Sequence, residues 1–242
     1  MKELLCNSIY FGVLISLIGY GLGLIIKSKV KMLIRNPLLN SILMAILNPL
    51  LISIIFVIIV LLTFNVDYES YNNGAKYLSY FLTPATVCLA IPLYQQLELL
   101  KGNFKAILGG IIAGTITSMG SILLLSMLFQ LNREQYITLL PKSVTTAIGM
   151  GISEELGGIV TITVAVIIIT GILGNMTGEF VCKIFRIKEP IAKGIALGTS
   201  AHAIGTVKAM EIGEVEGAMS SLAIAVAGLV TVLGASFFAN FM

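Results

Sequence analysis

The sequence is poor in charged residues. Asp, Glu, Lys and Arg make up only 11% of its 242 residues, while 57% are hydrophobic, and ordinary soluble domains carry roughly 25% charged residues. A soluble fold could not bury this much apolar surface, so the composition predicts a membrane protein surrounded by lipid. The net charge of +3 is scattered and forms no basic stripe, which argues against a nucleic-acid partner.

Cysteine, histidine and catalytic motifs are also scarce. The three cysteines, Cys6, Cys88 and Cys182, form no CxxC pair, so they are interpreted as small buried hydrophobic side chains and not as a disulfide framework or a zinc site. His202 is the single histidine, and the chain contains no GxSxG, HExxH or Walker motif. We therefore expect no enzyme, no catalytic residue, no metal and no cofactor.

Long apolar runs dominate the chain. A helix needs about 20 apolar residues to cross the hydrocarbon core. The stretch 37–64 is over-long and contains Asn48-Pro49, which predicts a kink or a short interfacial piece at 37–47. The run at 8–26 lacks a cleavage pattern and is expected to be a retained span. The predicted spans are 8–26, 37–64, 106–130, 158–182 and 216–241.

Lysine and arginine predict the orientation of these spans. Basic clusters follow the first span and the span at 158–182, and both clusters are expected on the cytoplasmic side. Lys101 and Lys105 would lie on the same side. The residues of the two clusters are Lys27, Lys29, Lys31 and Arg35, and Lys183, Arg186, Lys188 and Lys193.

Three further segments, 77–99, 140–155 and 191–209, are apolar but interrupted by proline, glycine or charge. Such segments make poor lipid-facing spans. Non-helical backbone at membrane depth survives only where it is buried in protein or lines a cavity. We therefore expect broken or re-entrant helices in the interior of the protein.

The interrupted segments nearly repeat one another. Residues 84–91 and 141–148 both read Pro-x-[Ser/Thr]-Val-x-x-Ala-Ile, and Ser143-x-x-x-Ala-Ile-Gly is echoed at Thr199. Interrupted segments in corresponding positions are typical of secondary transporters, although a chance match in low-complexity apolar sequence is the alternative. The prediction is an all-α polytopic integral membrane protein, transporter-like, with internal repeats. It is a single domain over 1–242, with scaffold spans at about 8–64 and broken-helix repeats at about 77–130, 140–182 and 191–241.

The helix breaks also carry hydroxyl groups. The first N–H groups of a helix are unpaired and its dipole is positive there, so hydroxyls at such a point favour a small anion, with a carboxylate as the obvious guest. The candidate substrate-binding residues are Thr86, Lys142, Ser143, Thr145, Thr146, Thr199, Ser200 and His202.

Each of these residues also has a structural interpretation. A hydroxyl in a membrane helix can bond to its own backbone. Lys142 can extend to the interface instead of binding a carboxylate. His202 can carry a coupling proton or donate to substrate, or it can make a structural hydrogen bond to a carbonyl group.

Five motifs resemble the LrgB/CidB family. The first is Thr83-Pro84-Ala85-Thr86-Val87-Cys88-Leu89-Ala90-Ile91-Pro92-Leu93-Tyr94, and the others lie at 140–148, 186–194, 198–206 and 213–222. Together they cover roughly residues 8–240 in order. The region 28–48 is longer than the family pattern, with Asn-Pro-Leu-Leu at 36–39 and again at 48–51, which affects where the second span starts.

The resemblance implies a multi-pass protein of the bacterial inner membrane with a smaller holin-like partner of the LrgA/CidA type. Family members are described as antiholin-like modulators of murein hydrolase activity and autolysis, or as carriers of small monocarboxylates such as pyruvate and, in the related chloroplast protein, glycolate and glycerate. The polar breaks favour the carrier, with the antiholin-like regulator as the alternative. We also expect contact with membrane lipid and a homo-oligomer.

Overall fold

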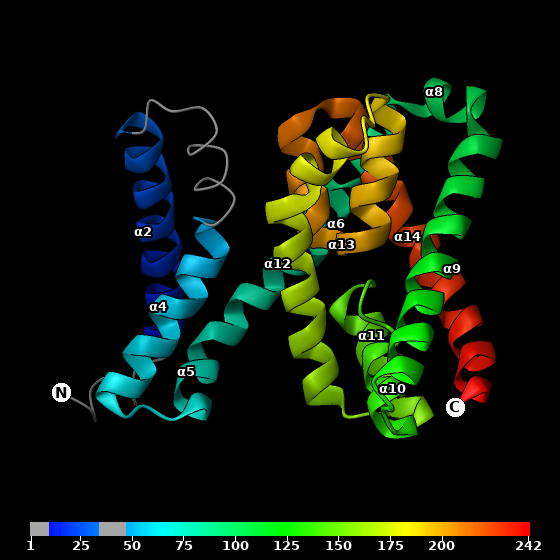
Figure 1. Ribbon diagram of the computed structural model, residues 1–242. Coiled ribbons are helices and arrows are strands. Elements are labelled where there is room, and N and C mark those ends of the chain that lie inside the picture. The colour runs from blue at the N-terminus through cyan, green and yellow to red at the C-terminus, as the bar shows by residue number, and fades with distance from the viewer. Residues whose placement is uncertain (1–9, 34–46) are drawn as a thin grey trace. The chain divides into compact units, whose positions relative to one another are not determined.

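The computed structural model describes residues 10–33 and 47–242, and these residues form helices and connecting turns with no strand among them (Figure 1). Five stretches are long and apolar enough to cross a membrane, so the all-α, multi-pass prediction is confirmed. They are Phe11–Leu33, Tyr68–Gln95, Phe104–Leu128, Val160–Ile184 and Glu214–Phe241. The chain divides into two compact units, 1–88 and 89–242, which are described separately. The expectation of a single domain stays a prediction.

In the first unit, α2 (Phe11–Leu33) packs against α4 (Pro49–Phe64) and α5 (Tyr68–Ala75). The Asn48 side chain accepts a hydrogen bond from the Leu50 N–H at 2.8 Å, and Pro49 stands at the first helical position. A proline at this position costs no hydrogen bond, because the backbone N–H of the first helical residue has no partner within the helix. Asn48-Pro49 therefore starts a helix. The piece predicted at 37–47 lies outside the described residues, except for residue 47.

The interrupted segment 77–99 forms a run of short helices. They are η1 (Lys76–Phe81), α6 (Leu82–Cys88), α7 (Ala90–Gln95) and α8 (Leu97–Gly102). The interruptions are therefore real, but the described side chains are mostly exposed within this chain, with Tyr80 at 72% and Tyr94 at 78%. The expected position of this segment in the interior of the protein stays a prediction.

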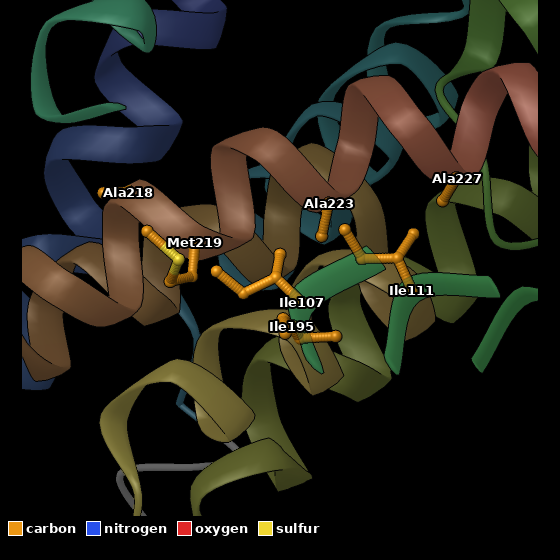
Figure 2. Packing of buried hydrophobic residues seen from close by; sticks show 7 residues of the cluster. All are labelled: Ile107, Ile111, Ile195, Ala218, Met219, Ala223 and Ala227. Atoms are coloured by element: carbon orange, nitrogen blue, oxygen red, sulfur yellow. The ribbon is translucent and has the colours of Figure 1, made fainter. Parts of the chain in front are cut away.

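The second unit is built on three long helices, α9 (Phe104–Leu128), α12 (Val160–Ile184) and α14 (Glu214–Phe238). Both ends of each helix lie within three residues of the ends of a predicted span. Side chains of α9 and α14 interdigitate with Ile195 in a core that includes Ile107, Ile111, Met219 and Ala223 (Figure 2). At the other end of the same pair, Met119 of α9 lies against Gly234 of α14, so these two helices run in the same direction.

A first helical hairpin lies between α9 and α12. The α10 helix (Arg133–Leu139) and α11 (Thr146–Leu156) are joined by residues 140–145. Thr138 lies level with Gly158 and Ile159, because its hydroxyl accepts the Ile159 N–H at 2.8 Å and a Cβ on Gly158 would contact its backbone. The chain therefore leaves this hairpin at the end where it entered. That end also holds the end of α14, since Tyr136 Oη donates to the Phe238 carbonyl at 3.0 Å; we call it the α10 end.

A second hairpin is formed by α13 (Pro190–Ile212). Its backbone breaks at His202, with φ 43° and ψ −136°, which leaves a first arm at 190–201 and a second arm at 203–212. A Cβ on Gly205 would lie 2.5 Å from the Leu197 carbonyl oxygen, whereas residues eight apart in a straight helix are separated by about 12 Å. The second arm is therefore folded back against the first.

The two hairpins enter the unit from opposite ends. Gly198 in the first arm of α13 packs on Ser220 of α14, and Met210 in the second arm packs on Gly217. Both outer ends of α13 therefore lie beside the start of α14, which we call the α13 end. Because α12 runs from the α10 end to the α13 end, the tips of the two hairpins point toward each other inside the unit.

Close packing at Gly198 gives a test of this arrangement. A Cβ on Gly198 would lie 2.6 Å from the Ser220 carbonyl oxygen and 2.7 Å from the Ala223 Cβ. We expect Gly198→Ala to destabilise the detergent-solubilised protein by about 1–3 kcal/mol, measured by thermal unfolding. The matched control is Gly109→Ala on α9, where a Cβ meets nothing within 4 Å and stability is expected to hold or rise slightly. Equal effects of the two substitutions would contradict the packing of α13 on α14.

Candidate functional site

A small cavity lies where the hairpin tips meet, and its lining is part apolar, from Met119, Leu140, Val144 and Ala227, and part polar. It is lined by the joining segment of the first hairpin and by α9, α13 and α14. Its hydroxyl-bearing residues are Thr115, Ser118, Ser143, Thr199 and Thr231. The space open to the centre of a water molecule is about 10 Å³, which suits one water-sized guest. In this conformation the cavity is therefore too small to hold a carboxylic acid.

Lys142 does not itself line the cavity, but it places a positive charge beside two serines that do. Its Nζ donates to Ser143 Oγ at 2.8 Å and to Ser118 Oγ at 3.3 Å, and Ser118 Oγ donates to Ser143 Oγ at 3.0 Å. Within residues 10–33 and 47–242, no carboxylate forms an ion pair with Lys142. The ammonium is therefore held by two hydroxyl groups and has no protein counter-charge among the described residues.

Counting hydrogens shows what this cluster offers a guest. The ammonium has three N–H groups and the two serines have two O–H groups. Three of these five hydrogens are used in the bonds among Lys142, Ser118 and Ser143. One ammonium N–H and the Ser143 O–H have no acceptor among the described residues. The cluster therefore has two unused donors and no acidic group, and the Ser143 donor belongs to a residue that lines the cavity.

The threonines around the cavity behave differently. Each donates its hydroxyl hydrogen to the carbonyl four residues earlier in its own helix: Thr115 to Ile111 at 2.8 Å, Thr199 to Ile195 at 2.8 Å and Thr231 to Ala227 at 2.7 Å. For Thr199 this is the backbone bond that the sequence left open as an alternative to substrate binding. The residue nevertheless lines the cavity, where its oxygen can only accept.

His202 lies at the tip of α13 but does not line the cavity. It is 4% exposed, and its Nε2 lies 2.9 Å from the Ile167 carbonyl oxygen of α12. Because a carbonyl can only accept, Nε2 carries the hydrogen. The His202 carbonyl in turn accepts from Thr206 Oγ1 at 3.0 Å. His202 thus makes the structural hydrogen bond to a carbonyl group that the sequence left open as an alternative.

The other candidate residues lie away from the cavity. Ser200 is exposed and donates to the Ala196 carbonyl at 2.6 Å. Thr145 is the N-cap of α11 without a side-chain capping bond, and Thr146 is the first residue of that helix; neither lines the cavity. Thr86 belongs to α6 in the first unit, and its side chain lies outside the described residues. Of the eight candidates, Ser143 and Thr199 line the cavity, and Lys142 is joined to it through its hydrogen bond to Ser143.

Sequence reasoning missed Thr115, Ser118 and Thr231. All three lie in long apolar helices whose other residues indicate a plain membrane span. One signal was available, because residues 115 and 118 are three apart and share a helix face. The sequence does not show which helix packs against that face of α9. In the structure it is α13, because a Cβ on Gly114 would lie 3.0 Å from Thr199 Oγ1.

Two helix starts also point toward the hairpin tips. The α11 helix begins at Thr146 and the second arm of α13 begins after His202, and both run outward from the tips toward opposite ends of the unit. The positive ends of their dipoles are therefore directed at the region that contains Lys142. This adds to an environment that suits an anion.

Comparison with known proteins agrees with the motifs. The model of the LrgB-like family matches residues 16–241. This chain belongs to the LrgB-like family. Antiholin-like protein LrgB from Bacillus mycoides (strain KBAB4), Bacillus cereus (strain B4264) and Bacillus anthracis (strain CDC 684 / NRRL 3495) is in each case 38% identical over 234 residues, which is 96% of this chain and 96% of the relative. The resemblance seen in the sequence is confirmed, and no solved structure matches this LrgB-family chain.

The backbone at His202 gives a second test. A φ of 43° with a ψ of −136° is a conformation that glycine adopts freely and that costs other residues about 1–3 kcal/mol. Both His202→Ala and His202→Gly lose the bond to the Ile167 carbonyl, but only glycine also relieves the backbone. We expect the glycine variant to be the more stable of the two by about 1–3 kcal/mol in thermal unfolding.

The matched control for this comparison is Ala196→Gly, in the helical part of the first arm, which should destabilise because glycine is a poor helix former. An alanine variant at position 202 that is at least as stable as the glycine variant would contradict the break.

Proposed function

We propose that this LrgB-family protein acts in the bacterial inner membrane as an antiholin-like regulator of murein hydrolase activity and autolysis, together with a holin-like partner of the LrgA/CidA type. The support is the similarity to relatives named antiholin-like LrgB over 96% of their length. The five apolar stretches fit a protein that associates with its partner through membrane helices, and further copies of the chain would associate in the same way.

A second function, carriage of a small monocarboxylate, is favoured by one observation. Lys142 and Ser143 have two unused hydrogens, Ser143 lines the cavity, and no carboxylate pairs with the ammonium in the described parts of the chain. A carboxylate supplies both the missing negative charge and two acceptor oxygens. Charge-assisted bonds of this kind are the strong ones, so a pyruvate- or glycolate-like acid is the guest that the cluster fits.

The arrangement of hairpins and spans supports the carrier. In this proposal the two hairpins are re-entrant and belong to an inverted internal repeat. Residues 133–184 and 190–238 are the two copies, and each contains a hairpin followed by a long helix. The two copies run in opposite directions. Transporters with inverted repeats bind their substrate at the middle, where broken helices meet. Because the cavity has room for about one water-sized group, binding an acid requires the hairpin tips to separate, which is the movement that alternating access needs.

Orientation follows from charge. The α13 end carries several basic residues near helix ends, whereas the α10 end carries Arg133. By the positive-inside bias the α13 end is cytoplasmic. No enzymatic chemistry or cofactor enters this proposal. The basic residues at the α13 end are Lys101, Lys105, Lys183, Arg186 and Lys188.

One set of variants separates the two functions. Lys142→Met removes the charge and keeps an apolar chain of similar length. In proteoliposomes that contain the protein and its LrgA-type partner, we expect this variant to lower the uptake of labelled lactate and pyruvate by at least about 30-fold, because a buried charge partner is lost. The same variant is then expressed in cells that lack the protein, and autolysis is measured.

The matched control is Lys105→Met, an exposed lysine that does not line the cavity, which should change neither readout. If cells that express Lys142→Met still regulate autolysis normally, the regulatory role does not depend on the cavity. Absence of uptake by the wild-type protein in the presence of its partner and a proton gradient would reject the carrier, and normal autolysis in cells lacking the protein would reject the antiholin-like role.

A further inference from the structure

The tip of the second hairpin, residues 199–206, is tied to two neighbouring helices. On the α12 side, Asn175 Nδ2 donates to the Ile204 carbonyl at 2.9 Å. On the α14 side, the hydroxyl oxygens of Thr206 and Ser220 lie 2.7 Å apart, and both residues are 0% exposed. The second tip is therefore held from two sides by buried hydrogen bonds.

Close packing adds to these bonds. A Cβ on Gly174 of α12 would lie 2.3 Å from the Ala201 Cβ, and a Cβ on Gly198, just before the second tip, would lie 2.6 Å from the Ser220 carbonyl oxygen. A carbonyl oxygen and an alanine Cβ are fixed to the main chain, so turning a side chain cannot relieve contacts of this kind. The second tip therefore has little freedom to leave α12 and α14.

The tip of the first hairpin, residues 142–150, is tied more loosely. In the described part of the chain, Ser118 of α9 is its one hydrogen-bond partner outside its own hairpin. Ala147 and Met150 are exposed within the chain. Val144 is the one large apolar side chain of this tip that is fully buried, so withdrawal of the tip exposes little apolar surface.

The first tip also packs on atoms that can move. A Cβ on Gly149 would lie 2.3 Å from Ile167 Cδ1, and a Cβ on Gly228 of α14 would lie 2.7 Å from Ile148 Cδ1. Both Cδ1 atoms are the far ends of isoleucine side chains, which can change rotamer without a movement of the main chain. These contacts restrain the first tip less than the main-chain contacts restrain the second tip.

The base of the first hairpin, by contrast, is fixed to α12. Thr163 Oγ1 of α12 lies 2.7 Å from Ser153 Oγ of α11 and 2.9 Å from the Thr138 carbonyl oxygen of α10. These three residues are at most 2% exposed, and breaking buried hydrogen bonds is costly. A hairpin that is fixed at its base and loosely held at its tip can pivot.

We propose that the first tip is the gate of the cavity, pivoting on the base formed by Thr138, Ser153 and Thr163, while the second tip stays on α12 and α14. This proposal rests on the proposed carrier function and names the element whose movement admits the guest. Both arms of the first hairpin lie between the cavity and the α10 end. Withdrawal of the first tip therefore opens the cavity toward the α10 end, which is the extracellular side in the orientation proposed above.

Hydrogen exchange measured by mass spectrometry compares the two tips without reference to transport. In the detergent-solubilised protein we expect the amides of residues 143–150 to exchange at least about 10-fold faster than those of residues 199–206, because fewer contacts must break for the first tip to open locally. Equal exchange at the two tips, or faster exchange at the second tip, would overturn the proposal.

A pair of serine variants refines this comparison. Ser118→Ala removes the hydrogen-bond partner of the first tip on α9, so exchange at residues 143–150 should accelerate further while exchange at residues 199–206 stays unchanged. The matched control is Ser121→Ala, because the Ser121 hydroxyl donates to the Ser118 carbonyl of its own helix at 2.7 Å. The control should change neither rate, and acceleration at both tips in Ser118→Ala would contradict independent movement of the first tip.

Disulfide tethers test the gate during uptake, in a chain whose own cysteines have been replaced. I148C with G228C ties the first tip to α14, and T206C with S220C ties the second tip to the same helix; none of the four positions lines the cavity. With the LrgA-type partner in proteoliposomes, oxidation of the first pair should lower the uptake of labelled pyruvate by at least about 10-fold, because a closed gate admits no substrate, and reduction should restore it. Oxidation of the second pair should leave uptake unchanged.

Uptake that continues while the first pair is oxidised, or that stops when the second pair is oxidised, would overturn the proposal and leave the carrier standing. Absence of uptake by the wild-type protein would overturn the carrier function, and the gate with it.

Discussion

The positive charge of Lys142 is the constraint on which the interior of residues 89–242 depends. Placing an ammonium group inside an apolar chain is expensive unless hydrogen bonds or an opposite charge compensate it. Here two serines, one from α9 and one beside the lysine itself, hold it at 3.3 and 2.8 Å respectively. Their geometry fixes where α9 stands against the first hairpin, and it leaves the charge unneutralised by any described carboxylate.

The hairpins make this arrangement possible in a chain with few polar residues. A break in a membrane helix frees backbone groups that must be satisfied within the protein. At the tip of α13 the Ile167 carbonyl accepts from the His202 ring and the His202 carbonyl accepts from Thr206. Glycines such as Gly198 and Gly205 let the arms lie against α14 and against each other with backbone contact, as small residues do in membrane helix packing. The polar tip is thus held in place by hydrogen bonds and close packing.

Much of this could be predicted from local sequence. The long spans follow from apolar length, and the breaks follow from Pro141, the glycines around His202 and the repeated Ala-Ile-Gly. Lys142, Ser143 and Thr199 were identifiable because each stands at such a break. Thr115, Ser118 and Thr231 were not, because their surroundings match a plain span and their role depends on which helix faces which. The same limit explains Ser200, which follows Thr199 in sequence but lies on an exposed face of the helix. It also explains His202, whose partner on α12 is 35 residues away in sequence.

The central claim is that the tips of two hairpins entering from opposite ends meet at one cavity. Cross-linking in native membranes tests it most directly, with S143C and T199C introduced together in a chain whose own cysteines have been replaced, and with a short bifunctional thiol reagent. The account predicts efficient intramolecular cross-linking of this pair and none for the control pair S143C and T177C, whose second position is exposed on α12. Equal cross-linking of the two pairs, or no cross-link between positions 143 and 199 when each single cysteine is reactive, would contradict it.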